Sequence, residues 1–377
     1  MKIAILSTFY PYRGGIAQFN AALYREFELA HDVRAFTFTR QYPDALFPGK
    51  SQYVGDDDTA TDRIPAERTL DTVNPLSYYR TAAKINKFAP DLLLTKFWMP
   101  FFAPSLGKVA RLVRKRGAKH ISILDNVIPH ERRPGDLALT RYFLRSCDAS
   151  IVMSDAVERD LLSLAPGARF ERHIHPLYSH FGQKMSREEA RKNLNIPIVK
   201  KVLLFFGFIR GYKGLDVLLD ALALLPEEYY VIVAGENYGS FDEYDKQIDR
   251  LNLRDRICLK VGYVPDADAA LYFSAADVCA LPYKSATQSG IVGISYQFDL
   301  PVIATDVGGL REMIEPYGSG LLAAKADPAV YAAAVKKYFD ENLAAKLSEN
   351  VANYKRLASW ESLAKTIEKL YSTIKAR

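Results

Sequence analysis

The sequence predicts an α/β protein built from two doubly wound domains, each a parallel sheet with helices on both faces. Short apolar runs alternate along the chain with longer amphipathic segments, which is the pattern of strand–helix–strand units. The pattern fades over residues 170–197 and then restarts. A chain of 377 residues is also long enough for two domains.

The point where the pattern fades sets the expected domain limits. We expect a first domain over residues 1–185, a second over 186–350, and a C-terminal helix over 351–377 that could pack back on the first domain. In the first half we expect strands at 2–7, 32–38, 91–95, 121–124 and 149–153, with helices at 17–29, 76–88 and 104–116.

The second half repeats this organisation, and several of its apolar runs end at glycine. The expected strands are 201–207, 229–234, 256–260, 278–281 and 301–305, and a helix is expected at 215–224. Two Rossmann-like sheets of this kind bind ligands outside the carboxyl ends of their strands. We therefore expect two such edges to face one another across a cleft.

Composition narrows the class of protein and its environment. The three cysteines have no short pairing and favour a reducing compartment. The apolar run at residues 3–6 is too short for a signal peptide, and no run is long enough to span a membrane. A net charge of +6 permits an anionic partner, but the dispersed basic residues do not indicate nucleic acid. We expect a cytoplasmic protein, free or bound to the inner face of the membrane.

The most informative segment is Phe206-Gly207-Phe208-Ile209-Arg210-Gly211-Tyr212-Lys213-Gly214. Glycine at the end of a strand lets the backbone approach a ligand closely. Arg210 and Lys213 place a fork-shaped guanidinium and a compact ammonium beside that turn, a combination suited to a diphosphate. A solvated basic loop before a helix is the alternative from spacing alone.

This segment resembles the donor diphosphate site of GT-B glycosyltransferases of retaining family 4: an apolar strand, Gly, a few residues, Arg, two residues, Lys-Gly. The resemblance continues through Ala234-Gly235, Gly262-Tyr263-Val264 and Ala276-Asp277-Val278 to 300–309. It implies a sugar transferase that retains configuration and uses a UDP- or GDP-sugar as co-substrate, without a metal or other cofactor. The implied donor-binding residues include Gly207, Gly235, Gly262, Tyr263, Val264, Thr287, Gln288, Ser289, Gly290 and Ile291, with Arg210 and Lys213 acting catalytically on the diphosphate.

Two segments of the first half extend the resemblance. Gly14-Gly15 follows the first strand and is similar to the family's glycine loop near the donor phosphate and the acceptor. The loop Asp125-Asn126-Val127-Ile128-Pro129-His130-Glu131-Arg132 lies where the family commonly carries a functional histidine. His130 is therefore the catalytic candidate, and Asp125, Glu131 and Arg132 are candidates for binding a glycan or lipid-linked acceptor.

One departure from the family concerns two glutamates that many members carry, with seven residues between them, before the fifth strand of this half. Counting back from Pro301, the two positions are Ala286 and Ile294, or Thr287 and Ser295 in a register shifted by one. Neither register supplies a carboxylate. A non-catalytic glycan or nucleotide-sugar binding protein is therefore one alternative, and a sugar-nucleotide epimerase of similar fold is another.

Two further features bear on metals and membranes. Asp266-Ala267-Asp268 has the letters of a metal motif, but it directly precedes an expected helix, where helix capping is the preferred interpretation and no metal is predicted. The aromatic segment 96–102, followed by a basic helix, could contact an anionic membrane surface, with core packing of the aromatic residues as the alternative.

Overall fold

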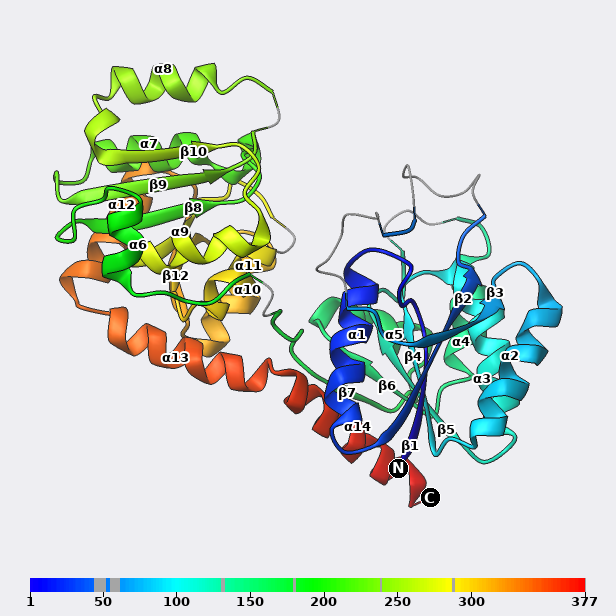
Figure 1. Ribbon diagram of the computed structural model, residues 1–377. Coiled ribbons are helices and arrows are strands. Elements are labelled where there is room, and N and C mark those ends of the chain that lie inside the picture. Colours follow the sequence, from blue (N-terminus) through cyan, green and yellow to red (C-terminus); the bar gives the residue numbers. More distant parts are fainter. Residues whose placement is uncertain are drawn as a thin grey trace. The chain divides into compact units, whose positions relative to one another are not determined.

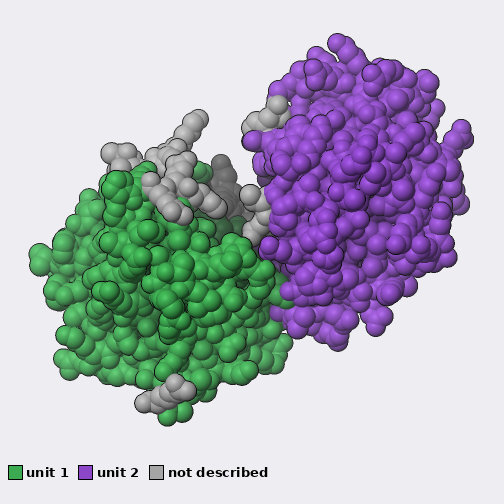
Figure 2. Space-filling view, turned by 180° about the vertical axis from the view of Figure 1, so that it is seen from behind, with its two compact units in different colours: residues 1–176, 358–377 green, residues 177–357 purple. Residues whose placement is uncertain are grey.

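The computed structural model describes residues 1–43, 52–54, 62–129, 133–178, 181–237, 239–286 and 289–376. The chain forms two compact units (Figure 2). Unit 1 comprises residues 1–176 and 358–377, and unit 2 comprises residues 177–357.

Unit 1 is built on a parallel sheet that has seven strands within the described residues, in the order β3-β2-β1-β4-β5-β6-β7. After β1 the chain adds β2 and β3 on one side and then returns to add β4 on the other. This reversal creates a switch point between the carboxyl ends of β1 and β4. The strands are β1 (Lys2–Leu6), β2 (Asp32–Arg40), β3 (Ala66–Asp71), β4 (Leu92–Phe97), β5 (Lys119–Leu124), β6 (Ala149–Val152) and β7 (Phe170–Arg172).

Helices cover both faces of this sheet, and each face has its own apolar core. Side chains of α1 (Gly15–Glu28) and α14 (Trp360–Lys375) pack on one face, where the two helices lie side by side (Figure 1). The helices on the other face are α2 (Pro75–Phe88), α3 (Ala103–Arg114), α4 (Asp136–Leu144) and α5 (Asp155–Leu164). A short 3₁₀ turn, η2 (Pro100–Phe102), precedes α3.

Unit 2 repeats the topology with a parallel sheet of six strands in the described part of the chain, ordered β10-β9-β8-β11-β12-β13. Its switch point lies between β8 and β11. The strands are β8 (Lys201–Phe206), β9 (Tyr229–Gly235), β10 (Ile257–Val261), β11 (Val278–Leu281), β12 (Val302–Thr305) and β13 (Gly320–Ala323).

Helices again cover both faces. One apolar core joins the sheet to side chains of α7 (Leu215–Ala223), α8 (Asp242–Arg250), α12 (Pro328–Asp340) and α13 (Ala344–Leu357). On the other face, Phe273 of α9 (Ala269–Ala275) packs against Phe206 of β8 and stacks on Phe298. The remaining elements are α6 (Arg187–Asn193), α10 (Gly290–Gln297), α11 (Leu310–Ile314), η3 (Gly211–Lys213), η4 (Arg254–Arg256), η5 (Asp266–Asp268) and η6 (Glu315–Tyr317).

The predicted fold class, two Rossmann-like doubly wound parallel sheets, is confirmed. The units divide at Pro176 and Leu177, whereas the fading periodicity had set the expected limit at residue 185. The C-terminal segment expected to begin at 351 is shared between the units, because α13 belongs to unit 2 and α14 to unit 1. No helix among the described residues combines the length and apolar character needed to cross a bilayer.

The aromatic segment 96–102 packs in the core of unit 1, so its interpretation as a membrane-contacting loop is wrong. Phe97 and Phe102 are fully buried. Phe101 stacks on Tyr42, and the indole N–H of Trp98 donates to the Tyr42 hydroxyl at 3.0 Å. These contacts use the aromatic surface that a membrane would otherwise bury.

Candidate functional site

At the carboxyl edge of the unit 2 sheet, backbone hydrogen bonds tie together the loops that follow β8, β9 and β10. The amide of Gly207 donates to the carbonyl of Ala234 at 2.9 Å, and the amide of Gly262 donates to that of Gly235 at 2.9 Å. A Cβ on Gly235 would lie 2.0 Å from the carbonyl oxygen of Gly207. Three predicted donor-binding glycines therefore form one continuous backbone surface.

Lys213 reaches back into this surface from η3. Its ammonium nitrogen lies 3.4 Å from the point where a Cβ on Gly207 would stand, and the Cδ1 atom of Ile291 lies 3.0 Å from the same point. The structure therefore brings Gly207 and Lys213, from the two ends of one loop, together with Ile291 of α10. Lys213 is 7% exposed, and burial, with a smaller contribution from Arg210, lowers its pKa.

The turn that carries Lys213 depends on Gly214, which adopts a positive φ of 71°. A Cβ on Gly214 would lie 2.0 Å from the carbonyl oxygen of Pro282. Gly214→Ala is therefore expected to destabilise unit 2 by about 3 kcal/mol, as calorimetry can measure, because the backbone must move as well as bear the strained φ. Gly239→Ala is the matched control, with φ of 107° and open space around its Cβ, and should cost about 1 kcal/mol. Equal losses in the two variants would contradict this account of the turn.

The start of α10 completes this edge beside the switch point. Ser289 is the N-cap residue, its hydroxyl oxygen accepts from the amide of Ile291 at 3.3 Å, and it also contacts the Tyr283 hydroxyl at 3.2 Å. A Cβ on Gly290 would meet nothing within 4 Å. Among the described residues the space beside Gly290 is therefore open, and the N-terminus of a helix attracts anions.

Three further predicted site residues, Arg210, Tyr263 and Val264, are more exposed than Lys213. Arg210 is the N-cap residue of η3, and its side chain is exposed. Tyr263 is 71% exposed and Val264 is partly buried, directly after Gly262 at the end of β10. Tyr263 and Val264 follow β10 and Lys213 follows β8, with β9 between these two strands. A ligand that contacts all three residues must therefore extend across the end of β9.

In unit 1 the glycine loop leads from β1 into α1. Gly14 is the N-cap residue of α1 with φ of 106°, and no described atom lies within 4 Å of the point where a Cβ on Gly14 or Gly15 would stand. The Asn20 side chain fixes the preceding turn, because its amide donates to the Ser7 hydroxyl at 2.8 Å and to the Thr8 carbonyl at 2.9 Å. The loop therefore places Gly14 and Gly15 at the unit 1 switch point.

Lys96 is a component of this edge that the sequence did not identify. Its ammonium donates to the carboxylate of Asp125 at 2.6 Å and lies 3.5 Å from the ring centroid of Phe19, a residue of α1. Lys96 is 3% exposed, and burial lowers its pKa while the Asp125 charge opposes that shift. The Asp125 side chain remains 26% exposed at the carboxyl end of β5. His130, Glu131 and Arg132, together with Thr287 and Gln288 of unit 2, lie outside the described residues.

Comparison with known families accounts for both units. Residues 14–176 match the model described as "Glycosyl transferase 4-like domain", and residues 186–357 match "Glycosyl transferases group 1". Both units belong to glycosyltransferase families. The predicted resemblance is therefore confirmed, with unit 1 as the 4-like domain and unit 2 as the group 1 domain.

Among individual relatives, the D-inositol 3-phosphate glycosyltransferase of Corynebacterium urealyticum is 31% identical over 231 residues, covering 58% of this chain and 53% of the relative. The D-inositol 3-phosphate glycosyltransferase 2 of Catenulispora acidiphila is 33% identical over 198 residues, covering 49% and 46%. The chain thus spans about half the length of the curated relatives it matches.

Solved structures share the fold across the whole chain. The Anabaena protein HepE, solved with UDP, superposes with a TM-score of 0.67 at 17% identity, covering 99% of this chain and 100% of HepE. A sucrose-phosphate synthase from Thermosynechococcus elongatus gives a TM-score of 0.63 at 20% identity, with both chains covered completely.

The group 1 domain shows what stands at the two positions without glutamate. Ser295 is fully buried, and its hydroxyl donates to the carbonyl of Leu300 at 2.8 Å, so it faces the core. Ile294 and Ala286 are partly buried and apolar. Glu236 follows Gly235 at this edge, and its backbone carbonyl accepts from the amide of Ile209 at 2.8 Å. Its position directly after a strand-terminal glycine was the sequence signal for it.

Among the described residues, no group of three or more His, Cys, Asp or Glu side chains is placed so that it could hold a metal ion. Asp268 stands at the N-cap of α9 but its side chain makes no capping hydrogen bond, so the capping expected of this motif is not observed. Cys147, Cys258 and Cys279 are free thiols.

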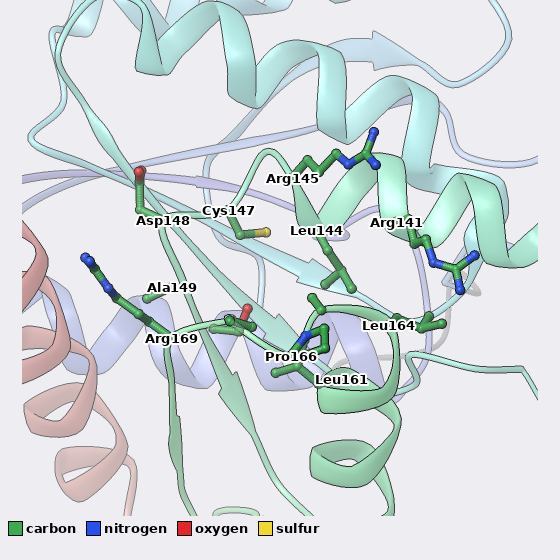
Figure 3. A pocket seen from close by; sticks show the side chains of 14 residues that line it. Arg141, Leu144, Arg145, Cys147, Asp148, Ala149, Leu161, Leu164, Pro166 and Arg169 are labelled. Atoms are coloured by element: carbon green, nitrogen blue, oxygen red, sulfur yellow. The ribbon is translucent and has the colours of Figure 1, made fainter.

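A pocket of about 500 Å³ lies in the 4-like domain at the opposite edge of the sheet. Leu144 and Leu161 line it where α4 and α5 end, and Ala149 lines it where β6 begins. Figure 3 shows Arg141 and Arg145 extending from α4 beside it. Ligands of such sheets bind at the carboxyl ends of the strands. This pocket lies at the amino ends, so it is separate from the candidate site.

Proposed function

We propose that this protein transfers a sugar from a nucleoside diphosphate sugar to a glycan or lipid-linked acceptor. The observation that carries the proposal is the convergence of the Lys213 ammonium, the Gly207 backbone and the start of α10 at one switch point. A buried cation, closely approaching backbone and the N-terminus of a helix together suit a diphosphate. Arg210, on the same turn, adds a second cation.

Departure of the diphosphate sets the main electrostatic demand of the reaction. As the bond between the sugar and the diphosphate breaks, negative charge develops on the diphosphate, and preorganised cations and amides stabilise that charge most effectively where water is excluded. Lys213 meets this condition because it is buried before any ligand arrives. Retention, and independence from a metal or other cofactor, belong to the proposal through the resemblance to family 4.

A UDP-sugar is the first donor to test. The structural neighbour HepE was solved with UDP and with UDP-glucose, which supports this choice. In the 4-like domain, Asp125 and the Gly14-Gly15 loop are proposed to contact the transferred sugar or the acceptor, with His130, Glu131 and Arg132 nearby in sequence. Tyr263 and Val264 are proposed to lie near the nucleotide base.

Thermal stabilisation by a panel of UDP- and GDP-sugars tests the donor site. The matching nucleotide should raise the melting temperature of the wild type, since a ligand that binds only the native state stabilises it. The Arg210→Ala/Lys213→Ala variant should lose that shift, whereas Lys336→Ala/Lys337→Ala, which removes two exposed lysines of α12, should keep it.

Product analysis then separates the remaining functions. Transfer to an acceptor, or slow release of UDP and sugar, supports the proposed enzyme. A free epimerised sugar formed without acceptor would indicate an epimerase. Binding without any turnover, in every acceptor extract tried, would favour the non-catalytic binding protein that the absent glutamates suggest.

A further inference from the structure

The outer face of α2 in unit 1 combines large apolar side chains with cations. Leu76 and Tyr79 are 65% and 53% exposed, and Val73, just before the helix, is 45% exposed. Arg80 and Lys87 are also exposed, at spacings that place them on the same side of the helix as Leu76 and Tyr79. We call Val73, Leu76, Tyr79, Arg80 and Lys87 the α2 outer face.

The helix that carries this face is well ordered at its N-terminus. Asn74 caps α2, its side chain accepting from the amide of Leu76 at 3.1 Å, and Pro75 occupies the first turn. The opposite side of the helix buries Tyr78, Ala82 and Ile85 in the core. The exposed apolar groups are therefore held in place by a well-anchored helix.

The charged residues of the two helices that form this surface are all basic: Arg80, Lys84 and Lys87 on α2, and Lys108, Arg111 and Arg114 on α3. Neither α2 nor α3 contains an acidic residue. Between positions 75 and 145 the sequence has 14 Lys and Arg residues and four Asp and Glu residues, a net charge of +10, while the whole chain carries +6. This stretch thus supplies the entire positive balance of the protein.

Carboxylates near this face already have partners. Glu67 of β3 pairs with Lys84 of α2 at 3.3 Å, and Asp71 pairs with Arg40 at 2.7 Å. The ammonium of Lys108, from the adjacent α3, lies 4.9 Å from the ring centroid of Tyr79. That contact extends the mixed aromatic and basic surface from α2 onto α3.

We propose that the α2 outer face docks on an anionic membrane surface. Basic side chains attract acidic lipid headgroups, and the exposed apolar side chains can enter the boundary between headgroups and acyl chains. A nucleic acid would use the cations but gain nothing from Val73 and Leu76, so the combination favours lipid. The proposal does not depend on the proposed sugar transfer.

Co-sedimentation with vesicles tests the proposal. The wild type should bind vesicles in which about a third of the lipid is phosphatidylglycerol and should not bind phosphatidylcholine vesicles, with binding weakened between about 0.1 and 0.5 M salt. Arg80→Gln/Lys87→Gln should weaken binding on the order of 30-fold. Leu76→Ser/Tyr79→Ser, which leaves the charge unchanged, should weaken it at least about tenfold.

Matched controls change the same residue types elsewhere. Ile198→Ser/Val199→Ser replaces two apolar side chains of unit 2 that are 51% and 81% exposed, and Lys336→Gln/Lys337→Gln removes two exposed charges. Both should bind as the wild type does, and all four variants should melt within a few degrees of it. Equal binding to phosphatidylcholine, no binding to the acidic vesicles, or unchanged binding by Leu76→Ser/Tyr79→Ser would each overturn the proposal. The last outcome, with competition by single-stranded DNA, would indicate a general polyanion surface.

Discussion

Lys213→Met is expected to lower kcat/KM for the sugar nucleotide by about 10²–10³-fold, the range found when one preorganised charge-stabilising group is removed from an active site. Methionine keeps most of the side-chain volume, so the loop around Gly207 and Ile291 should keep its packing. Steady-state kinetics with the donor identified by thermal stabilisation would measure the effect. Lys336→Met, on an exposed face of α12, should leave kcat/KM unchanged.

The pH dependence of donor binding gives an independent check on Lys213. Its pKa lies below the ordinary value of 10.5, chiefly because of burial. A lysine is cationic below its pKa, so UDP affinity should be retained at neutral pH and fall as the pH rises through that lowered value. Lys213→Arg keeps a charge at every accessible pH and should flatten this fall. Calorimetric titrations that give the same pH profile for both proteins would contradict a charge role for Lys213.

The sequence was sufficient for the central strands and failed at several strands toward the sheet edges. Val278–Leu281 was predicted with its observed bounds because a buried parallel strand is a continuous apolar run between turns. β3 was missed because its sequence, AERTLD, is largely polar and lies at the edge of the sheet. β7 has only three residues, too few to show any periodicity.

The candidate site shows the same division. Gly207 and Lys213 were predicted from the pattern of glycines and cations that resembles family 4, and the structure brings the two close together. Lys96 was not, because it stands beside aromatic residues and was considered only as part of that segment, either on a membrane surface or in the core. Its partner Asp125 lies 29 residues away, and only the parallel pairing of β4 with β5, in which Phe97 is opposite Leu124, brings the two together. A long-range register of this kind has no local signal in the sequence.

The second large effect is expected at this pair. Asp125→Ala should destabilise unit 1 by about 3 kcal/mol, because it leaves the Lys96 ammonium buried without its counter-ion. Lys96→Met should cost much less, about 1 kcal/mol, since Asp125 is 26% exposed and can be hydrated while the new side chain packs against Phe19. The double variant Lys96→Met/Asp125→Ala should be more stable than Asp125→Ala alone. Both tryptophans of the chain, Trp98 and Trp360, lie in unit 1, so tryptophan fluorescence during urea unfolding reports on this unit.

Titration of Lys96 determines how the stability of these variants should depend on pH. Burial lowers the pKa of Lys96 in the folded state, so the unfolded chain binds more protons between that pKa and 10.5, and stability contributed by this group rises with pH across that window. Removing the Asp125 charge removes the interaction that opposes the shift, so the window should begin at lower pH in Asp125→Ala. The stability deficit of that variant should therefore be largest near neutral pH and shrink as the pH rises from there, because the buried ammonium can lose its proton. A deficit that stays constant with pH, or that persists in the double variant, would mean that Asp125 stabilises the fold through something other than the Lys96 charge.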